Sequence, residues 1–335
     1  MTSSFQPSTP PAQGASWQSS AEQSSAAFEA RIAALWVFPV KSCAGISVSQ
    51  AALNPTGLAH DRAWMVVDAE GEMVTQRELP RMALVQPELL YSGASLTQLV
   101  LHASGMSVLN LPLHVPMPHP GATETPTPVQ VHVWDDHVPA FDMGVAASAW
   151  LTAFLGDSLG PLRLVRFDEN HHRPSSAKWT QGLSSSNQFS DGFPVLVAST
   201  ASLDELNTRL HAKGDAAVDM RRFRVNVVLG NAVGQATEVL AHDEDRIGTL
   251  TIHSPCDTEG ESLQLQPVKP CPRCPMPNID PDTAHANASV SDTLQAYRQD
   301  PRVNGALTFG MNCVPVTGIG QVLRVGQRVS AAWVF

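Results

Sequence analysis

The sequence predicts an α+β protein that is predominantly β, built from β-barrel-like domains with about three helices. Glycine and proline together supply 48 of the 335 residues, which favours many turns between short strands. Charged residues make up 16%, below the quarter that is usual for globular proteins, so long surface helices are few. The hydrophobic content of 43% can build a large core, and the length suits two domains.

In the first half, short apolar or alternating segments indicate strands. Residues 1–28 instead are rich in Ser, Gln, Ala, Thr and Pro, and we expect a disordered tail because they bury little apolar surface. Ala69–Gly71 and Gly105 mark two hairpin turns, and six prolines between Pro112 and Pro128 mark a loop. The strands expected here are 31–40, 46–53, 63–68, 72–77, 97–102, 106–111 and 129–134.

The second half is expected to add strands and helices in turn. An Ala-rich helix over 144–155 ends at Gly156, and a second over 202–210 begins with the capping-box spacing of Ser202 and Glu205. A third helix is expected over 292–299. The strands expected are 161–167, 194–198, 223–229, 248–253, 262–268 and 320–329.

Charge and cysteine usage exclude several classes of protein. A net charge of −10 argues against nucleic acid or an anionic membrane as the main partner. No apolar run approaches the 18 residues of a membrane span, and the first 30 residues lack the Lys or Arg of a targeting signal. An odd number of cysteines fits a reducing cytoplasm, which is the location we expect: Cys43, Cys256, Cys271, Cys274 and Cys313.

The segment Lys269–Ala284, K-P-C-P-R-C-P-M-P-N-I-D-P-D-T-A, carries two cysteines on a proline-stiffened loop. Cys271 and Cys274 supply half of a tetrahedral zinc site, but no second Cys or His pair has zinc spacing. A redox dithiol normally places its first cysteine at a helix N-terminus, whereas loop-like residues follow here. Inert buried thiols are a further alternative. The last is a thiolate ligand to a soft metal that an organic cofactor carries.

Such a cofactor needs an anion-binding pocket, and candidate residues for it are spread along the chain. Lys41 and Ser42 follow the first strand, Arg62 precedes a later one, and Arg224 and Asn226 are expected on the strand 223–229. The segment 190–194, S-D-G-F-P, offers backbone donors at a strand start. Lysine and arginine are the usual phosphate ligands, although each of these cations taken alone is more often a solvated surface charge.

Five motifs taken in order carry a resemblance: V-F-P-V-K-S-C-A-G-I-S-V, D-R-A-W-M-V-V-D-A-E-G, S-D-G-F-P-V-L-V-A-S-T-A-S-L-D-E-L-N, F-R-V-N and C-P-R-C-P-M-P-N-I-D-P-D-T. Together they resemble the MOSC family, in the branch with an additional N-terminal β-barrel domain that includes the mitochondrial amidoxime-reducing components. The resemblance runs from about Arg31 to the C-terminus. It implies a MOSC N-terminal β-barrel domain over 29–168, with the helical segment near 144–155, and a MOSC domain over 169–335.

The resemblance also implies a cofactor, molybdopterin holding molybdenum through its dithiolene, with Cys274 as the protein ligand to the metal. No pyridoxal phosphate is expected. Asn312 stands where mitochondrial members have tyrosine, and Ala284 where relatives commonly have glycine, so the sequence departs from the family at both positions. The positions that match cofactor-contacting ones are Lys41, Ser42, Arg62, Asp191, Gly192, Phe193, Arg224, Asn226, Pro272 and Arg273, and Asn312 joins them as a cofactor-binding candidate.

The function expected from this resemblance is two-electron reduction of N-oxygenated compounds such as hydroxylamines, amidoximes or N-hydroxylated bases. Asp280 and Asp282 are candidates for relaying protons, and an equal alternative is that they accept N–H groups of their own loop. No ferredoxin-like cysteine run or dinucleotide-binding motif occurs, so we expect a separate electron donor, a ferredoxin or flavoprotein reductase. The alternative function is sulfur transfer, with Cys274 carrying a persulfide as a sulfur carrier or in cofactor sulfuration.

Overall fold

Seven strands close into a barrel in the computed structural model, which describes residues 28–93, 95–113, 127–232, 238–254 and 262–334. β14 also pairs with β19, and this pairing closes the sheet on itself. The order around the barrel is β14 (Val195–Ser199), β15 (Val227–Gly230), β1 (Phe28–Val37), β21 (Arg328–Ala331), β16 (Leu250–Ile252), β17 (Leu263–Pro272) and β19 (Ala306–Thr317).

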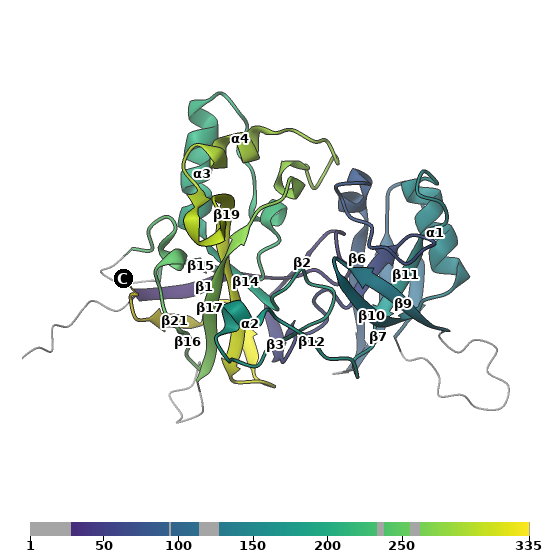
Figure 1. Ribbon diagram of the computed structural model, residues 1–335, viewed down its shortest axis with the longest axis horizontal. Coiled ribbons are helices and arrows are strands. Elements are labelled where there is room, and N and C mark those ends of the chain that lie inside the picture. Colours follow the sequence, from purple (N-terminus) through teal and green to yellow (C-terminus); the bar gives the residue numbers. More distant parts are fainter. Residues whose placement is uncertain (1–27, 94, 114–126, 233–237, 255–261, 335) are drawn as a thin grey trace, which may run out of the picture.

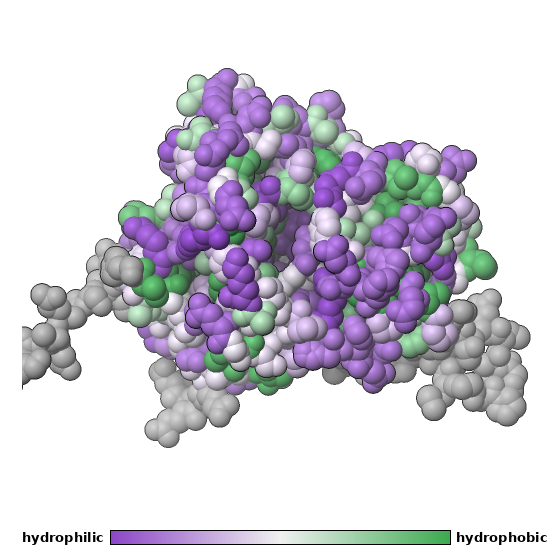
Figure 2. All heavy atoms as spheres, viewed as in Figure 1, coloured by the Kyte–Doolittle hydropathy of each residue, from purple (hydrophilic) through white to green (hydrophobic). Residues whose placement is uncertain are grey.

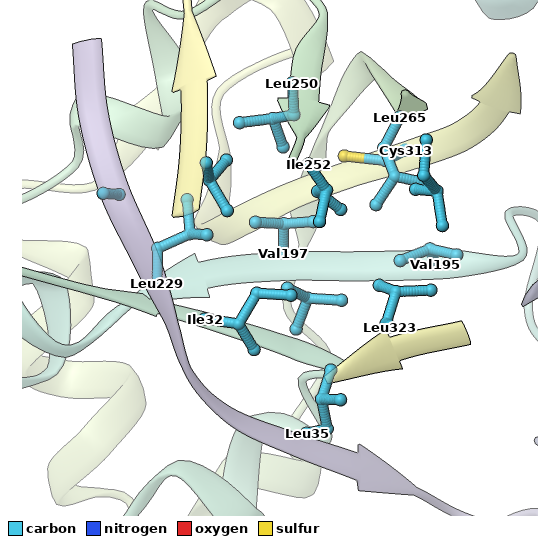
Figure 3. Packing of buried hydrophobic residues seen from close by; sticks show 14 of the residues in the cluster. Ile32, Leu35, Val195, Val197, Leu229, Leu250, Ile252, Leu265, Cys313 and Leu323 are labelled. Atoms are coloured by element: carbon cyan, nitrogen blue, oxygen red, sulfur yellow. The ribbon is translucent and has the colours of Figure 1, made fainter. Parts of the chain in front are cut away.

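The barrel interior is filled by alternate side chains of these strands, as Figure 3 shows for Ile32, Val197, Leu229 and Leu265. β1 alternates between buried and half-buried residues because only one of its faces points inward. β14 and β15 are buried throughout, since the helix α3 (Thr200–Ala212) covers their outer face. Such continuous burial explains their near-unbroken apolar sequence.

A second β-rich unit lies beside the barrel (Figure 1). One of its sheets has the order β5 (Trp64–Val67), β11 (Arg163–Phe167), β10 (Asp136–Asp142), β9 (Thr127–Val133). The other sheet is β6 (Gln86–Ser92), β7 (Ser95–His102), β8 (Leu109–Pro112). Both sheets and the helix α1 (Val145–Leu155) share one core that includes Trp64, Leu99 and Leu151.

Smaller elements complete the described chain. β20 (Val322–Arg324), β3 (Gln50–Asn54) and β4 (Gly57–Leu58) form a sheet, as do β12 (Arg173–Pro174) and β13 (Ser186–Asn187). β2 (Ile46–Val48) pairs with β1, and β18 (Gln299–Asp300) with β19. The other helices are α2 (Ala177–Thr180) and α4 (Ser289–Gln295), with 3₁₀ turns at Pro80–Leu84, Met220–Phe223, Asp243–Asp245, Met276–Asn278 and Pro301–Val303.

The predicted fold class is confirmed: the protein is mostly β, and its described residues contain four α-helices. Strand β1 precedes the second unit in the chain but pairs with β15 and β21 of the barrel, so the N-terminal segment contributes to both units. The domain boundary at residues 168/169 stays a prediction. None of the described helices has the length and apolarity to cross a membrane.

Several predicted elements differ in detail. Residues 46–53 divide into β2 and β3, residues 320–329 into β20 and β21, and 72–77 keep only isolated bridges at Glu72 and Met73. The strands β6, β10 and β19 were not anticipated. The tail 1–28, apart from Phe28, and most of the proline-rich loop lie outside the described residues, as does Cys256.

The start of α3 corrects the predicted capping box. Ser199, not Ser202, is the N-cap, because its side chain accepts a hydrogen bond from the Ser202 amide at 3.1 Å. The Ser202 hydroxyl instead donates to the buried carboxylate of Glu244 at 2.6 Å. Ser-x-x-Ser offers the same cap geometry as the pattern read from the sequence, one turn earlier.

Candidate functional site

A cavity of about 300 Å³ opens where the barrel meets the second unit. The surface in Figure 2 is mainly hydrophilic and is hollowed near the centre, between the two units. Residues far apart in the sequence line this cavity together. The structure brings here all twelve residues that the sequence suggested as metal or cofactor ligands: Lys41, Ser42, Arg62, Asp191, Gly192, Phe193, Arg224, Asn226, Pro272, Arg273, Cys274 and Asn312.

Four non-glycine residues that line the cavity have left-handed backbone conformations. Ser42, Arg62, Trp134 and Arg224 have φ of 66°, 51°, 56° and 55°. This region of φ costs energy for residues with a side chain, and strained residues gather at binding sites where the surrounding structure holds them. The concentration of such residues therefore marks the cavity as a built site.

Lys41 is a buried cation in the cavity wall, and its backbone amide donates to the carbonyl of Trp64 in the second unit at 2.8 Å. Its Nζ donates to the carbonyl of Phe189 at 2.8 Å and to Oδ1 of Asp191 at 2.5 Å. Burial lowers the pKa of Lys41, while the charge of Asp191 opposes that shift. For Asp191, burial would raise the pKa, but the charge of Lys41 and its hydrogen bond leave it below the usual range. The Lys41 side chain is thus desolvated, paired with Asp191 and within reach of an anion in the cavity.

Arg62 and Arg224 lie against the ring of Phe38, with guanidinium carbons 4.6 Å and 4.3 Å from its centroid. Arg62 Nη2 donates to the carbonyl of Arg224 at 3.0 Å, and its Nη1 is paired with Asp61. Burial, and next the positive charge of Arg62, lower the pKa of Arg224 to about 9.

One nitrogen of Arg224 lacks a partner. Nη1 donates to the carbonyl of Cys43 at 2.6 Å, whereas Nη2 is buried with no hydrogen-bond acceptor among the described residues. A buried unpaired donor on a cation is costly, and an anion in the cavity would satisfy it. A phosphate-bearing cofactor therefore fits this cavity, because its anionic group would accept a hydrogen bond from Nη2 of Arg224.

Asn226 differs from its expected place. It was expected on a strand over 223–229, but β15 begins only at Val227. Its amide side chain accepts from the Leu196 amide at 3.0 Å and donates to the Trp36 carbonyl at 3.2 Å. Asn226 therefore ties neighbouring barrel strands together at the cavity wall.

The cysteine segment is more regular than the loop that the sequence suggested, because β17 continues through Cys271 to Pro272. Breaks in register between Pro267 and Lys269 and between Pro270 and Pro272 shift the alternation of its side chains. As a result Lys269 and Cys271, two residues apart on one face, both line the cavity, and Cys274 lies two residues beyond the end of the strand.

The geometry weakens two alternatives for these thiols. Cys271 lies in a strand and not at a helix N-terminus, so it lacks the setting of a redox dithiol. Within the described ranges, no three His, Cys, Asp or Glu residues cluster tightly enough to hold a metal ion, so a tetrahedral zinc set is absent there. Cys43 is inert, since burial raises the pKa of its thiol to about 12.

Arg273 stands between the two half-buried cysteines. Its Nη1 donates to Sγ of Cys271 at 3.1 Å and its Nη2 to the carbonyl of Phe223 at 2.9 Å. Its Nε is buried and finds no acceptor in the part of the chain that the structure covers. A thiol donor beside an incompletely satisfied guanidinium suits a metal held by an anionic chelate.

The two predicted proton relays lie elsewhere. Neither Asp280 nor Asp282 lines the cavity. Asp280 accepts from the amides of Asp282 and Thr283 and from Arg222, while Asp282 forms a two-pronged pair with Arg221. This placement favours the loop-stabilising alternative.

Sequence reasoning did not single out several lining residues. Arg77 packs over the ring of Trp134 at 4.7 Å, and Trp134 donates to Asp191 at 3.2 Å. Arg173 does not itself line the cavity, but it is almost fully buried and holds the lining segment at Asp191 by donating to the carbonyls of Gln188 and Ser190. Lys269 also lines the cavity, and its position five residues before Cys274 in the quoted segment could have identified it as a site residue.

Comparison with protein families agrees with this geometry. The MOSC N-terminal beta barrel domain matches residues 29–158, and the MOSC domain matches residues 184–330. The chain is 35% identical to human "Mitochondrial amidoxime-reducing component 1", over 81% of this chain and 73% of that protein. It is 32% identical to human "Mitochondrial amidoxime reducing component 2", over 80% and 72%. It is 29% identical to human "Molybdenum cofactor sulfurase", over 83% of this chain and 29% of that protein. The chain therefore belongs to the MOSC family, with both the N-terminal β-barrel and the MOSC domain.

Proposed function

We propose that this protein is a molybdenum-cofactor-dependent reductase of N-oxygenated compounds that takes its electrons from a separate donor protein. The observation that carries the proposal is that one cavity brings together a thiol, Cys274, and two guanidinium groups with unsatisfied buried donors, Arg224 and Arg273. Similarity to the amidoxime-reducing components supports the reaction class.

The residues divide into a thiol end and an anion end. Cys274 would bind the metal, since a thiolate is a good donor to soft and high-valent transition metals. Lys41, Arg62 and Arg224 would bind the phosphate end of the cofactor, with Ser42 beside them. When bound, the cofactor would supply the two-electron redox chemistry of the reaction.

The protein's own residues position the reactants. Reduction of a hydroxylamine consumes two electrons and two protons, cleaves the N–O bond, and releases an amine and water. The left-handed backbones at Ser42, Arg62 and Arg224 fix the cations before the ligand arrives. Because Asp280 and Asp282 lie outside the cavity, solvent at its mouth is the simplest source of the protons.

The test is metal analysis of the purified protein followed by an assay. Stoichiometric molybdenum, together with reduction of benzamidoxime or a hydroxylamine by a reduced viologen dye, is the expected result. Electron transfer from NADH without any second protein would contradict the requirement for a separate donor. Protein that binds molybdenum but reduces no N-oxygenated compound would contradict the reductase.

A second candidate function rests on similarity to the molybdenum cofactor sulfurase. In that case Cys274 would carry a persulfide and transfer the outer sulfur atom to a cofactor. Cyanolysis distinguishes the two candidates: molybdenum-free protein that releases thiocyanate, and loses this in Cys274→Ser, favours the sulfur carrier. Retained molybdenum without cyanolysable sulfur favours the reductase.

A further inference from the structure

The cavity carries more positive charge than the residues assigned to cofactor binding account for. Among the described lining residues, six are basic and only Asp191 is a carboxylate. The cations assigned to the cofactor are Lys41, Arg62, Arg224 and Arg273. Asp191 is already engaged by Lys41 and Trp134. Positive charge is therefore left over on a protein whose net charge is −10.

Lys269 holds part of this surplus, and its surroundings are unusual. Its Nζ lies 5.2 Å from the ring centroid of Trp179 and 5.8 Å from that of Phe193. The side-chain ammonium of Lys269 forms neither a hydrogen bond nor an ion pair with any residue that the structure describes. The two rings orient the ammonium but hold it only weakly at such a partly exposed site, and they leave its three N–H donors free.

The position of Lys269 is fixed by the fold. The break in register of β17 at Pro267–Lys269 brings this side chain onto the same cavity-facing side as Cys271. Its backbone pairs with that of Asn312 on β19, another lining residue. A cation held in the wall near the thiol end, without an anion of its own, is suited to receive one from a ligand.

We propose that Lys269, between Trp179 and Phe193, recognises an anionic group on the substrate, so that the protein prefers N-oxygenated compounds bearing a carboxylate or phosphate over neutral or cationic ones. This inference rests on the proposed reductase function. It extends that function to a substrate class: one end of the molecule carries the N–O bond, and the other carries negative charge.

The test compares three amidoximes of similar shape with the molybdenum-loaded enzyme and a viologen dye. They are benzamidoxime, its 4-carboxylate and its 4-carboxamide, the last being a neutral match in size. We expect kcat/KM for the carboxylate to exceed that for the carboxamide about tenfold, equivalent to about 1.4 kcal/mol. This preference is expected to shrink with added salt.

Variants locate the effect. Lys269→Met should abolish the preference and Lys269→Arg should keep most of it, while molybdenum content stays at the wild-type level in both. Lys178→Met is the matched control, because Lys178 also lies over the Trp179 ring, at 5.5 Å, but is exposed and does not line the cavity. This control should keep the preference.

Three results would overturn the inference. A carboxylate preference that persists in Lys269→Met places recognition elsewhere. Loss of molybdenum in Lys269→Met assigns the lysine to the cofactor. Equal rates for carboxylate and carboxamide in the wild type refute the substrate class while leaving the reductase intact, whereas no reduction of any of the three removes the proposed function itself.

Discussion

Arg273 donates its hydrogen bond to Sγ of Cys271, 3.1 Å away, although the family resemblance assigns the metal to the other thiol, Cys274. The two cysteines of C-P-R-C thus have different surroundings. Both line the cavity, but Cys271 lies within a strand and has a charged donor, while Cys274 lies just beyond the strand end. A guanidinium that occupies one sulfur leaves the second as the available ligand.

The first prediction separates these thiols. Cys274→Ser should lose nearly all its molybdenum, because a serine hydroxyl is a poor ligand at neutral pH where a thiolate is a good one. Cys271→Ser should retain most of it, and elemental analysis of the two purified variants is the measurement. Equal loss of bound metal in the two variants, whether molybdenum or zinc, would mean that both cysteines bind it.

The anion end gives a second prediction. Lys41→Met removes a desolvated charge 2.5 Å from Asp191, and we expect at least about tenfold weaker cofactor retention. Pterin released on gel filtration and measured by its fluorescence after oxidation reports this directly. Lys213→Met is the control, since Lys213 caps the far end of α3 and bonds to Asp292 and Thr293. Undiminished retention in Lys41→Met would show that phosphate binds elsewhere.

Asp282 provides a third prediction. Its hydrogen bonds to Arg221 lower its pKa, so it is ionised at neutral pH and is a poor proton donor. Asp282→Asn should therefore change turnover of an N-oxygenated substrate by no more than about twofold. The pH profile of kcat should keep its shape as well. A loss of tenfold or more would restore the proton-relay role that the sequence suggested.

Gly57 links the fold to the cavity and gives a fourth prediction. It has φ of +105°, and a Cβ there would lie 2.2 Å from the carbonyl oxygen of Pro194, directly after the lining residue Phe193. Gly57→Ala should lower the free energy of unfolding by roughly 2–4 kcal/mol, through strain and steric overlap. Gly214→Ala, with φ of +84° but open space around it, should cost only about 1 kcal/mol. Urea unfolding measures the free energy of unfolding of both variants. Similar decreases would mean that the backbone at Pro194 shifts to accommodate the new methyl group at little cost.

The residues that the sequence located best are those whose chemistry is local. Lys41, Cys274 and the Ser190–Pro194 segment stand in short motifs at strand ends, where a backbone change and a polar group coincide. Trp134 and Lys269 were not predicted as site residues, because their roles depend on a hairpin tip and on a register break that only strand pairing creates.

The same reasoning explains the strand errors. β19 contains Gly310, Asn312, Cys313 and Pro315, which obscure the apolar alternation of a strand. Its register against β17 comes from packing in the barrel, where Gly310 has φ of +76° and a Cβ would lie 2.6 Å from the Val197 carbonyl. Local propensity carries no information on such long-range contacts.

The last prediction concerns His242, which lies outside the cavity. Its ring faces Tyr297 and Phe309 at centroid distances of 5.7 Å and 6.2 Å, and neither ring nitrogen has a partner among the residues described. Burial, and then the charges of Arg298 and Arg209, lower its pKa to about 3. Below about pH 6.5, the unfolded chain binds a proton that the folded one refuses, so the free energy of unfolding falls as the pH drops toward 3.

His242→Asn tests this linkage, because asparagine tolerates the left-handed backbone at this position, where φ is 64°. The variant should be less stable at pH 7.5 but should lose about 1–2 kcal/mol less than the wild type between pH 7.5 and 4.5, a figure reduced for the ring's partial exposure. Urea unfolding at several pH values measures both slopes. Carboxylates contribute equally to both proteins, so the difference between the slopes isolates the imidazole, and parallel curves would show that His242 takes up its proton in the folded state.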